Sequence, residues 1–217
     1  MQRLQRLILL FLGFFRPGYP FPIHGHRAAL FLLLLTGLIL CGASPPRTVR
    51  VGAYENHPKI YTDQNGKIRG IIPELLEYIT TREGWKLEYI SGNWTESLKR
   101  LENNELDLMV DVAESEDRRE KFDFHDETVL INWGTVYTVP DFEIGSLFDL
   151  EGKRIAVMEG SIHTVGPGGI RELTDRFDIE CDFIGVADYS RVFGLLDEKG
   201  ADAGVVNRLY GTLFDKN

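Results

Sequence analysis

Cysteine is scarce in this chain, and acidic residues are missing from its beginning. The two cysteines among 217 residues are Cys41, in a hydrophobic segment, and Cys181, so the later part of the chain has no pair for a disulfide. Residues 1–50 contain six arginines but no lysine, aspartate or glutamate. Residues 51–217 therefore hold all 33 acidic residues and 18 of the 24 basic ones, a net charge of −15. Such a charge repels phosphate, which argues against a nucleic-acid partner.

Long apolar runs are also missing. The longest run, residues 28–43, follows Arg27 and is shorter than the ~20 residues that a membrane-spanning helix needs. It has the size of the hydrophobic region of a signal peptide, and basic residues before it with acids only after it favour export. We predict that residues 1–46 are a signal peptide, with an uncleaved membrane anchor as the alternative. Lipidation at Cys41 is a weaker alternative, because Leu40 before it is bulky. The rest of the chain is then periplasmic or otherwise extracytoplasmic.

Metal and dinucleotide motifs are not evident. The five histidines show no metal-binding spacing such as His-x-x-x-His. The glycines at 166–169 lack the strand-to-helix pattern of a dinucleotide site. We expect no cofactor and no metal.

The chain after residue 46 alternates short apolar segments with helical patterns. Strands are expected near residues 49–53, 86–90, 106–112, 128–139, 154–158, 179–184 and 201–206. Helices are expected between them, including one opened by Pro73 and ended by Gly84 and one capped by Asn93. Repeated strand–helix–strand units predict parallel sheets with right-handed crossovers. Two such series predict two α/β lobes, residues 47–138 and 139–217, with a hinge near the run at 128–139.

Polar residues follow several of these strands. In open parallel sheets, ligands bind outside the carboxyl ends of the strands. In the first lobe these ends are residues 54–56 and 111–115, and in the second they are residues 159–161 and Asn207. Side chains of this kind hydrogen-bond a small polar solute, so the sequence predicts a binding site between two lobes.

Ordered sequence blocks give the chain a specific resemblance. They are RGIIPELL at 69–76, LENNELDLM at 101–109, SEDR at 115–118, DLEGKRIAV at 149–157 and ADAGVV at 201–206. From Thr48 onward the chain resembles solute-binding protein family 3, the bacterial extracellular amino-acid-binding type. Stretches at 107–113, 133–134 and 205–211 are most similar to extracytoplasmic input domains of sensor histidine kinases. The resemblance implies an α/β, two-lobe, periplasmic-binding-protein-like (type II) fold with parallel-rich sheets, preceded by an N-terminal hydrophobic segment. It also implies a C-terminal truncation, because the return crossing into the first lobe is missing.

The resemblance also implies roles for individual residues. Arg118 matches the arginine that clamps a ligand carboxylate, because a planar guanidinium donates two charge-assisted hydrogen bonds. Ser115 and Ser161 match the hydroxyl groups that bond the ligand from the two lobes. Tyr54 and Asn56 lie where the family presents its first ligand loop.

Three residues depart from the pattern of the family. Asn207 stands where amino-acid binders commonly place the aspartate that pairs with the ligand's ammonium, so an ordinary amino acid is in doubt. Asp111 and Glu114 place extra acid beside Arg118, either to neutralise it or to accept from a cationic ligand.

Several of these residues have a plain structural alternative. Arg118 lies in the charged stretch 116–121, which by itself reads as a solvated helix. Trp94 and Trp133 are pocket walls or core residues. Ser161 and Asn207 are ligand contacts or helix caps. The predicted ligand-binding residues are Tyr54, Asn56, Trp94, Asp111, Ser115, Arg118, Trp133, Ser161 and Asn207.

The resulting hypothesis is non-enzymatic. Two lobes close over a small polar, carboxylate-bearing solute, in a sensor input domain or a transport-type binding protein. The expected partners are the solute, the membrane through the N-terminal segment, and a histidine kinase or an ABC transporter. The alternative is an enzyme on the same fold, similar to cyclic-acid dehydratases or to accessory domains of peptidoglycan lyases. Its acid and base would be Asp111 or Glu114 with His57 or His163.

Overall fold

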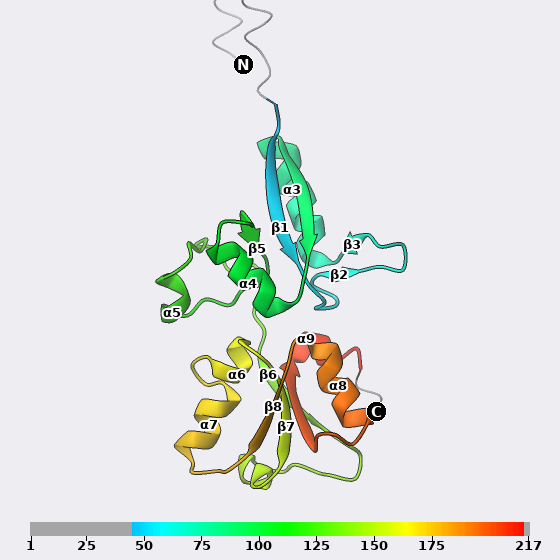
Figure 1. The fold of residues 1–217 in the computed structure, drawn as a ribbon, viewed down its shortest axis with the longest axis vertical. Helices are drawn as coiled ribbons and strands as arrows, with labels where there is room; N and C mark the ends of the chain where they lie inside the picture. The colour runs from blue at the N-terminus through cyan, green and yellow to red at the C-terminus, as the bar shows by residue number, and fades with distance from the viewer. Residues whose placement is uncertain (1–44, 215–217) are drawn as a thin grey trace, which may run out of the picture. The chain divides into compact units, whose positions relative to one another are not determined.

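The computed structural model describes residues 45–214. Its first sheet has the strand order β4-β1-β5, and all of its strand pairs are parallel (Figure 1). β1 pairs with β4 along its whole length, from Arg47 opposite Trp85 to Ala53 opposite Ser91. The elements of this region are β1 (Arg47–Ala53), the hairpin β2 (Tyr61–Thr62) and β3 (Ile68–Arg69), α3 (Ile71–Glu83), β4 (Trp85–Ser91), α4 (Trp94–Glu102), β5 (Leu108–Met109) and α5 (Glu116–Arg119).

The second sheet has the order β6-β9-β7-β8, in which only β6 is antiparallel to its neighbour. The elements here are β6 (Gly134–Thr138), the 3-10 helix η1 (Leu147–Leu150), β7 (Arg154–Met158), α6 (Ile162–Val165), α7 (Ile170–Arg176), β8 (Asp182–Val186), α8 (Tyr189–Asp197), β9 (Ala203–Asn207) and α9 (Arg208–Gly211). The predicted combination of two parallel-rich α/β sheets is confirmed. The predicted lobe boundary after residue 138 stays a prediction, but β6, which the prediction assigned to the first lobe, pairs with β9 in the second sheet.

Both faces of the second sheet are buried, as expected for parallel strands covered by helices. Alternate residues of β7 point to opposite faces. Ile155 and Val157 belong to the core cluster that includes Ile170 of α7. Ala156 and Met158 belong to the cluster that includes Val192 of α8. In Figure 1, α7 and α8 lie on opposite sides of β7 and β8.

The ends of the helices in the first region follow the local sequence closely. α3 begins at Ile71, two residues before the predicted start at Pro73, and ends as predicted at Gly84, which has φ 66°. Only glycine adopts this left-handed conformation without a steric cost, so it stops the helix. Asn93 caps α4 as predicted, because its side chain accepts a hydrogen bond from the Glu96 amide at 2.8 Å.

Two predicted strands are shorter than expected. The run 128–139 forms a strand only at Gly134–Thr138, because its partner β9 ends at Asn207, opposite Gly134, and the chain then enters α9. The run 106–112 forms a strand only at Leu108–Met109, which pair with Val51 and Gly52 of β1. The end of β9 limits the length of β6, which apolar sequence alone does not reveal.

An arginine–aspartate pair fastens the amino end of each sheet. Arg50 Nε and Nη2 donate to Asp107 Oδ2 and Oδ1, both at 2.9 Å. Arg154 Nε and Nη2 donate to Asp202 Oδ2 and Oδ1, at 3.1 and 2.8 Å. In each pair the arginine amide also donates to the aspartate. These hydrogen bonds hold the pKa of both carboxyl groups below its usual value.

The predicted signal peptide or membrane anchor at residues 1–46 lies almost entirely outside the described residues. Between residues 45 and 214, no helix is both long enough and apolar enough to cross a membrane.

Candidate functional site

The carboxyl end of β1 supplies buried polar side chains, as predicted. Tyr54 directly follows the strand and Asn56 lies two residues later; both are buried. The Asn56 amide nitrogen donates to the Tyr54 hydroxyl at 3.0 Å and to Asp111 Oδ2 at 2.6 Å. Burial, and next the charge of Asp111, raise the pKa of the Tyr54 phenol well above its usual value. The phenol is therefore neutral and donates to Asp111 Oδ2 at 3.1 Å.

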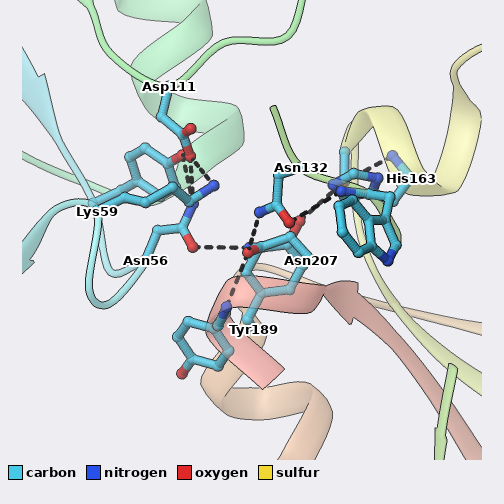
Figure 2. A network of polar contacts seen from close by, with 11 residues as sticks. Asn56, Lys59, Asp111, Asn132, His163, Tyr189 and Asn207 are labelled. Atoms are coloured by element: carbon cyan, nitrogen blue, oxygen red, sulfur yellow. Dashed lines mark hydrogen bonds and ion pairs between the residues drawn. The ribbon is translucent and has the colours of Figure 1, made fainter. Parts of the chain in front are cut away.

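Asp111 is the centre of this cluster, and its ionic partner is a residue that the sequence did not indicate. Lys59 Nζ forms an ion pair with Asp111 Oδ2 (Figure 2). The exposed fraction of the two side chains is only 5% and 13%. This pair was not predictable from the sequence, because a lysine in a loop is usually solvated. Asp111 has φ 56°, a conformation that aspartate tolerates better than most residues, and the chain turns there after β5.

The start of α3 fixes the loop that carries Lys59. The amides of Ile71 and Ile72 donate to the carbonyl oxygens of Pro58 and Lys59, at 3.1 and 3.0 Å. A Cβ atom at Gly70, which has φ 124°, would lie 2.4 Å from the Lys59 carbonyl oxygen, so only glycine permits this approach. The start of α3 therefore holds the backbone of Lys59, while Asp111 holds its side chain.

Arg118, the predicted clamp, lies half-buried between the two sheets. Its Nη1 donates to the Ala113 carbonyl at 2.6 Å and its Nη2 to the Gly160 carbonyl at 2.9 Å. Its guanidinium lies 5.6 Å from the centroid of the Trp94 ring. Burial lowers its pKa, although an arginine stays charged at neutral pH.

The two acids expected beside Arg118 have other partners. Asp111 pairs with Lys59, and Glu114 pairs with Arg119, whose Nη2 donates to Glu114 Oε2 at 2.8 Å on the surface. Within residues 45–214, Arg118 forms no ion pair with a carboxylate. The prediction that Asp111 or Glu114 neutralises the clamp is therefore wrong for this structure, because nearer cations take both carboxylates.

Trp94 connects the two sheets. Its side chain is buried, with a 3% exposed fraction, and its Nε1 donates to the Gly160 carbonyl at 3.1 Å. Its ring also meets Tyr54 edge-on, with 5.1 Å between the centroids. Trp94 is thus a core residue and at the same time a wall of the polar cluster.

The second sheet contributes neutral groups. The Asn207 amide nitrogen donates to Asn56 Oδ1 at 2.9 Å, and its Oδ1 accepts from Asn132 and from the Tyr210 amide (Figure 2). Ser161 Oγ lies 3.0 Å from the Tyr189 hydroxyl. Burial raises the pKa of Tyr189 to about 12. Asn207 and Ser161 also cap α9 and α6, so the helix-cap role holds for both.

His163 is the titratable group of α6 nearest to these residues. Burial, followed by the positive charges of Lys59 and Arg118, lowers its pKa to about 4. The imidazole is therefore neutral at physiological pH. The sequence nominated His163 only as an acid or base for the enzyme alternative.

Two predicted residues take a smaller part. The Ser115 hydroxyl does not cap α5, and its carbonyl accepts from the Arg118 amide at 3.1 Å. Trp133 contacts the polar cluster through its backbone amide, which donates to Asn132 Oδ1 at 3.0 Å. Its side chain is 52% exposed, with the Arg208 guanidinium over the ring. The other seven predicted residues lie in one connected set of contacts. Their role toward a ligand stays a prediction.

A hollow of about 370 Å³ lies beside this polar cluster and includes none of the nine predicted residues. Its lining residues are Glu55, His57, Tyr61, Thr62, Ser190, Tyr210, Leu213 and Phe214. In this structure several of the predicted residues bond to one another across the two sheets, as Asn56 does to Asn207.

Two parallel-rich sheets with polar residues at their carboxyl ends define the type II periplasmic-binding-protein fold, and the solved structures confirm this prediction. An ancestral arginine-binding protein bound to arginine matches with a TM-score of 0.71 and 23% identity, over 80% of this chain and 75% of that one. A histidine kinase sensor domain with similarity to periplasmic binding proteins matches with a TM-score of 0.67 and 25% identity, over 78% of this chain and 72% of that one.

Comparisons of the sequence also find bacterial solute-binding proteins. The profile of bacterial extracellular solute-binding proteins, family 3, matches residues 49–143. The "Probable histidine-binding protein" of Campylobacter jejuni is 23% identical over 146 residues, which cover 61% of this chain and 57% of that protein. The chain spans just over half the length of the curated relatives that it matches. These matches confirm the resemblance to solute-binding family 3 and, among solved structures, to a sensor domain.

Proposed function

We propose that the chain is an extracytoplasmic binding domain for a small, polar, carboxylate-bearing solute. The observation that carries the proposal is Arg118. Its guanidinium is half-buried, forms no ion pair within residues 45–214, and reaches the second sheet at the Gly160 carbonyl. A buried cation without a counter-ion is costly, and a bound carboxylate would supply the missing charge with two parallel hydrogen bonds.

The similarity to solute-binding family 3 and to a sensor domain supports this proposal. So does the distribution of the polar groups over both sheets, because a ligand that contacts both lobes favours the closed arrangement by its differential affinity. Asn56 and Arg118 would bond it from the first lobe, and Ser161 and Asn207 from the second. Trp94 would pack against its body.

Closure of this kind serves both transport and sensing. The predicted export segment at residues 1–46 would deliver the domain to the outside of the membrane or anchor it there. A cleaved segment would favour a soluble component of an ABC transporter. An uncleaved one would favour the input domain of a sensor kinase. Sequencing the amino terminus of the protein recovered from cells distinguishes the two.

The test is the binding of a panel of small carboxylic acids to the full chain in mild detergent, measured by titration calorimetry. Arg118→Ala is expected to weaken every hit by roughly 10- to 100-fold, because a charge-assisted pair contributes about 1.5–3 kcal/mol. Arg119→Ala is the matched control. Arg119 is the next residue in the chain and pairs with Glu114 on the surface, so its replacement should not change the affinity. Unchanged affinity in Arg118→Ala would show that the clamp is wrong.

The same experiment addresses the enzyme alternative. No turnover of a bound acid is expected, because Asp111, the buried acid of the cluster, is held in an ion pair with Lys59. Turnover of a cyclic acid that is lost in Asp111→Asn would favour an enzyme instead.

A further inference from the structure

We propose that Lys59 is a built-in counter-cation that sets the ligand class of this site: acids without an amino group, such as hydroxy acids, in preference to zwitterionic amino acids. This inference rests on the proposed function, because it assumes that Arg118 receives a ligand carboxylate. It adds what the rest of the ligand is, and which residue decides it.

The charges in the cluster favour a single negative charge on the ligand. Lys59 and Arg118 are positive, and among residues 45–214 Asp111 is the carboxylate that bonds to Tyr54, Asn56 and Lys59. Tyr54 and Tyr189 are neutral phenols. The sum is one positive charge, which a monoanion neutralises and a zwitterion does not. Buried charges of one sign are stable only when they are paired.

Two acceptor atoms in the cluster, Asp111 Oδ2 and Asn207 Oδ1, already take several hydrogen bonds. An incoming ammonium needs buried acceptors, and the strongest here is Asp111. Its Oδ2 atom already accepts from Tyr54, Asn56 and Lys59 (Figure 2). In the second sheet, Asn207 Oδ1 already accepts two hydrogen bonds, and an amide carries no charge. Lys59 thus already supplies the positive charge that a ligand ammonium would otherwise bring to Asp111.

Lys59 is not free to move away. Its amide donates to the Asn56 carbonyl at 2.9 Å, and its own carbonyl accepts from Ile72 at the start of α3. Its side chain is 5% exposed, so leaving Asp111 would strand two buried charges. A ligand ammonium would have to break this pair before it could bind.

Matched ligand pairs test the inference on the full chain in mild detergent, by titration calorimetry. L-phenylalanine is compared with L-phenyllactate, and L-leucine with L-2-hydroxy-4-methylpentanoate; each pair differs only in amino against hydroxyl. The wild-type chain is expected to bind the hydroxy acid at least tenfold more tightly in each pair. Equal or tighter binding of the amino acids would overturn the inference while leaving the carboxylate clamp standing. Failure of all four compounds to bind would count against both proposals.

Substitution of Lys59 tests the mechanism. Lys59→Met frees Asp111 and is expected to shift the preference at least tenfold toward the amino acid of each pair. Lys67→Met, which removes an exposed lysine of the same hairpin region, should leave the preference unchanged. The double variant with Asp111→Asn should lose the shift, because no carboxylate then remains for the ammonium. Melting curves identify unfolded variants, and if Lys59→Met does not fold, the wild-type pairs alone decide.

Discussion

The two sheets are built alike at their amino ends and differently at their carboxyl ends. At the amino ends, Arg50 with Asp107 and Arg154 with Asp202 make the same set of hydrogen bonds. At the carboxyl ends, the first region brings the buried pair Lys59–Asp111. The second region brings neutral hydroxyl and amide groups. The repeated pairs hold each sheet together, whereas in our proposal the unequal ends set the charge of the ligand.

The largest loss of stability is expected from breaking the buried Lys59–Asp111 pair. Asp111→Ala leaves Lys59 buried without a counter-charge, and the free energy of unfolding should fall by roughly 3–5 kcal/mol. Urea unfolding of the full chain measures it. The double variant Lys59→Met with Asp111→Asn removes both charges and should recover most of the loss. A cost below about 1 kcal/mol for Asp111→Ala, the range of exposed pairs, would mean that Lys59 reaches solvent.

A smaller change in stability is expected from the titration of His163, at the carboxyl end of the second sheet. The pKa of His163 is about 4 in the fold against 6.5 ordinarily, so between these values the unfolded chain binds a proton that the folded chain does not. The free energy of unfolding therefore falls as pH decreases from about 6.5 to about 4. We expect this group to contribute about 2 kcal/mol of the decrease, less than full linkage because the ring is partly exposed.

Urea unfolding at a series of pH values measures the contribution as the difference between the wild type and His163→Gln. The variant should show the shallower decrease with acid. His125→Gln removes an exposed histidine and is the matched control, which should follow the wild type. Identical pH profiles for the wild type and His163→Gln would contradict the buried, neutral state of His163.

The smallest loss of stability is expected from breaking the partly exposed pairs Arg50–Asp107 and Arg154–Asp202. Asp107→Asn and Asp202→Asn should each lower the midpoint of thermal unfolding by a few degrees, and by similar amounts. Both carboxyl groups have a pKa below the ordinary 3.8, so their contribution is complete at neutral pH and is lost as pH falls through the lowered pKa. Asp141→Asn, at an exposed aspartate, serves as the control. A large loss in only one variant would show that the two pairs are not equivalent.

The path of the chain was largely predictable. Strand–helix–strand order, the stop at Gly84 and the cap at Asn93 depend on neighbours in the sequence, and all three were found. The lengths of β5 and β6 were not predictable, because they depend on which residues of β1 and β9 pair with them in space. Among the site residues, Tyr54, Asn56 and Asn207 follow strands and could be nominated by the carboxyl-end rule.

By itself, the sequence determined the fold class, the resemblance to solute-binding family 3 and the carboxyl ends at which polar residues gather. These follow from periodicity, local turn chemistry and ordered motifs. Only the tertiary structure decided which charges pair. Lys59 and Asp111 form an ion pair although they are 52 positions apart in the sequence. Glu114 forms its ion pair with Arg119, although Arg118 is one position nearer in the sequence. Ionic partners are set by distance and burial in space, which no local pattern encodes. Among the described residues 45–214, Arg118 therefore has no carboxylate partner, whereas Asp111 Oδ2 accepts from Tyr54, Asn56 and Lys59.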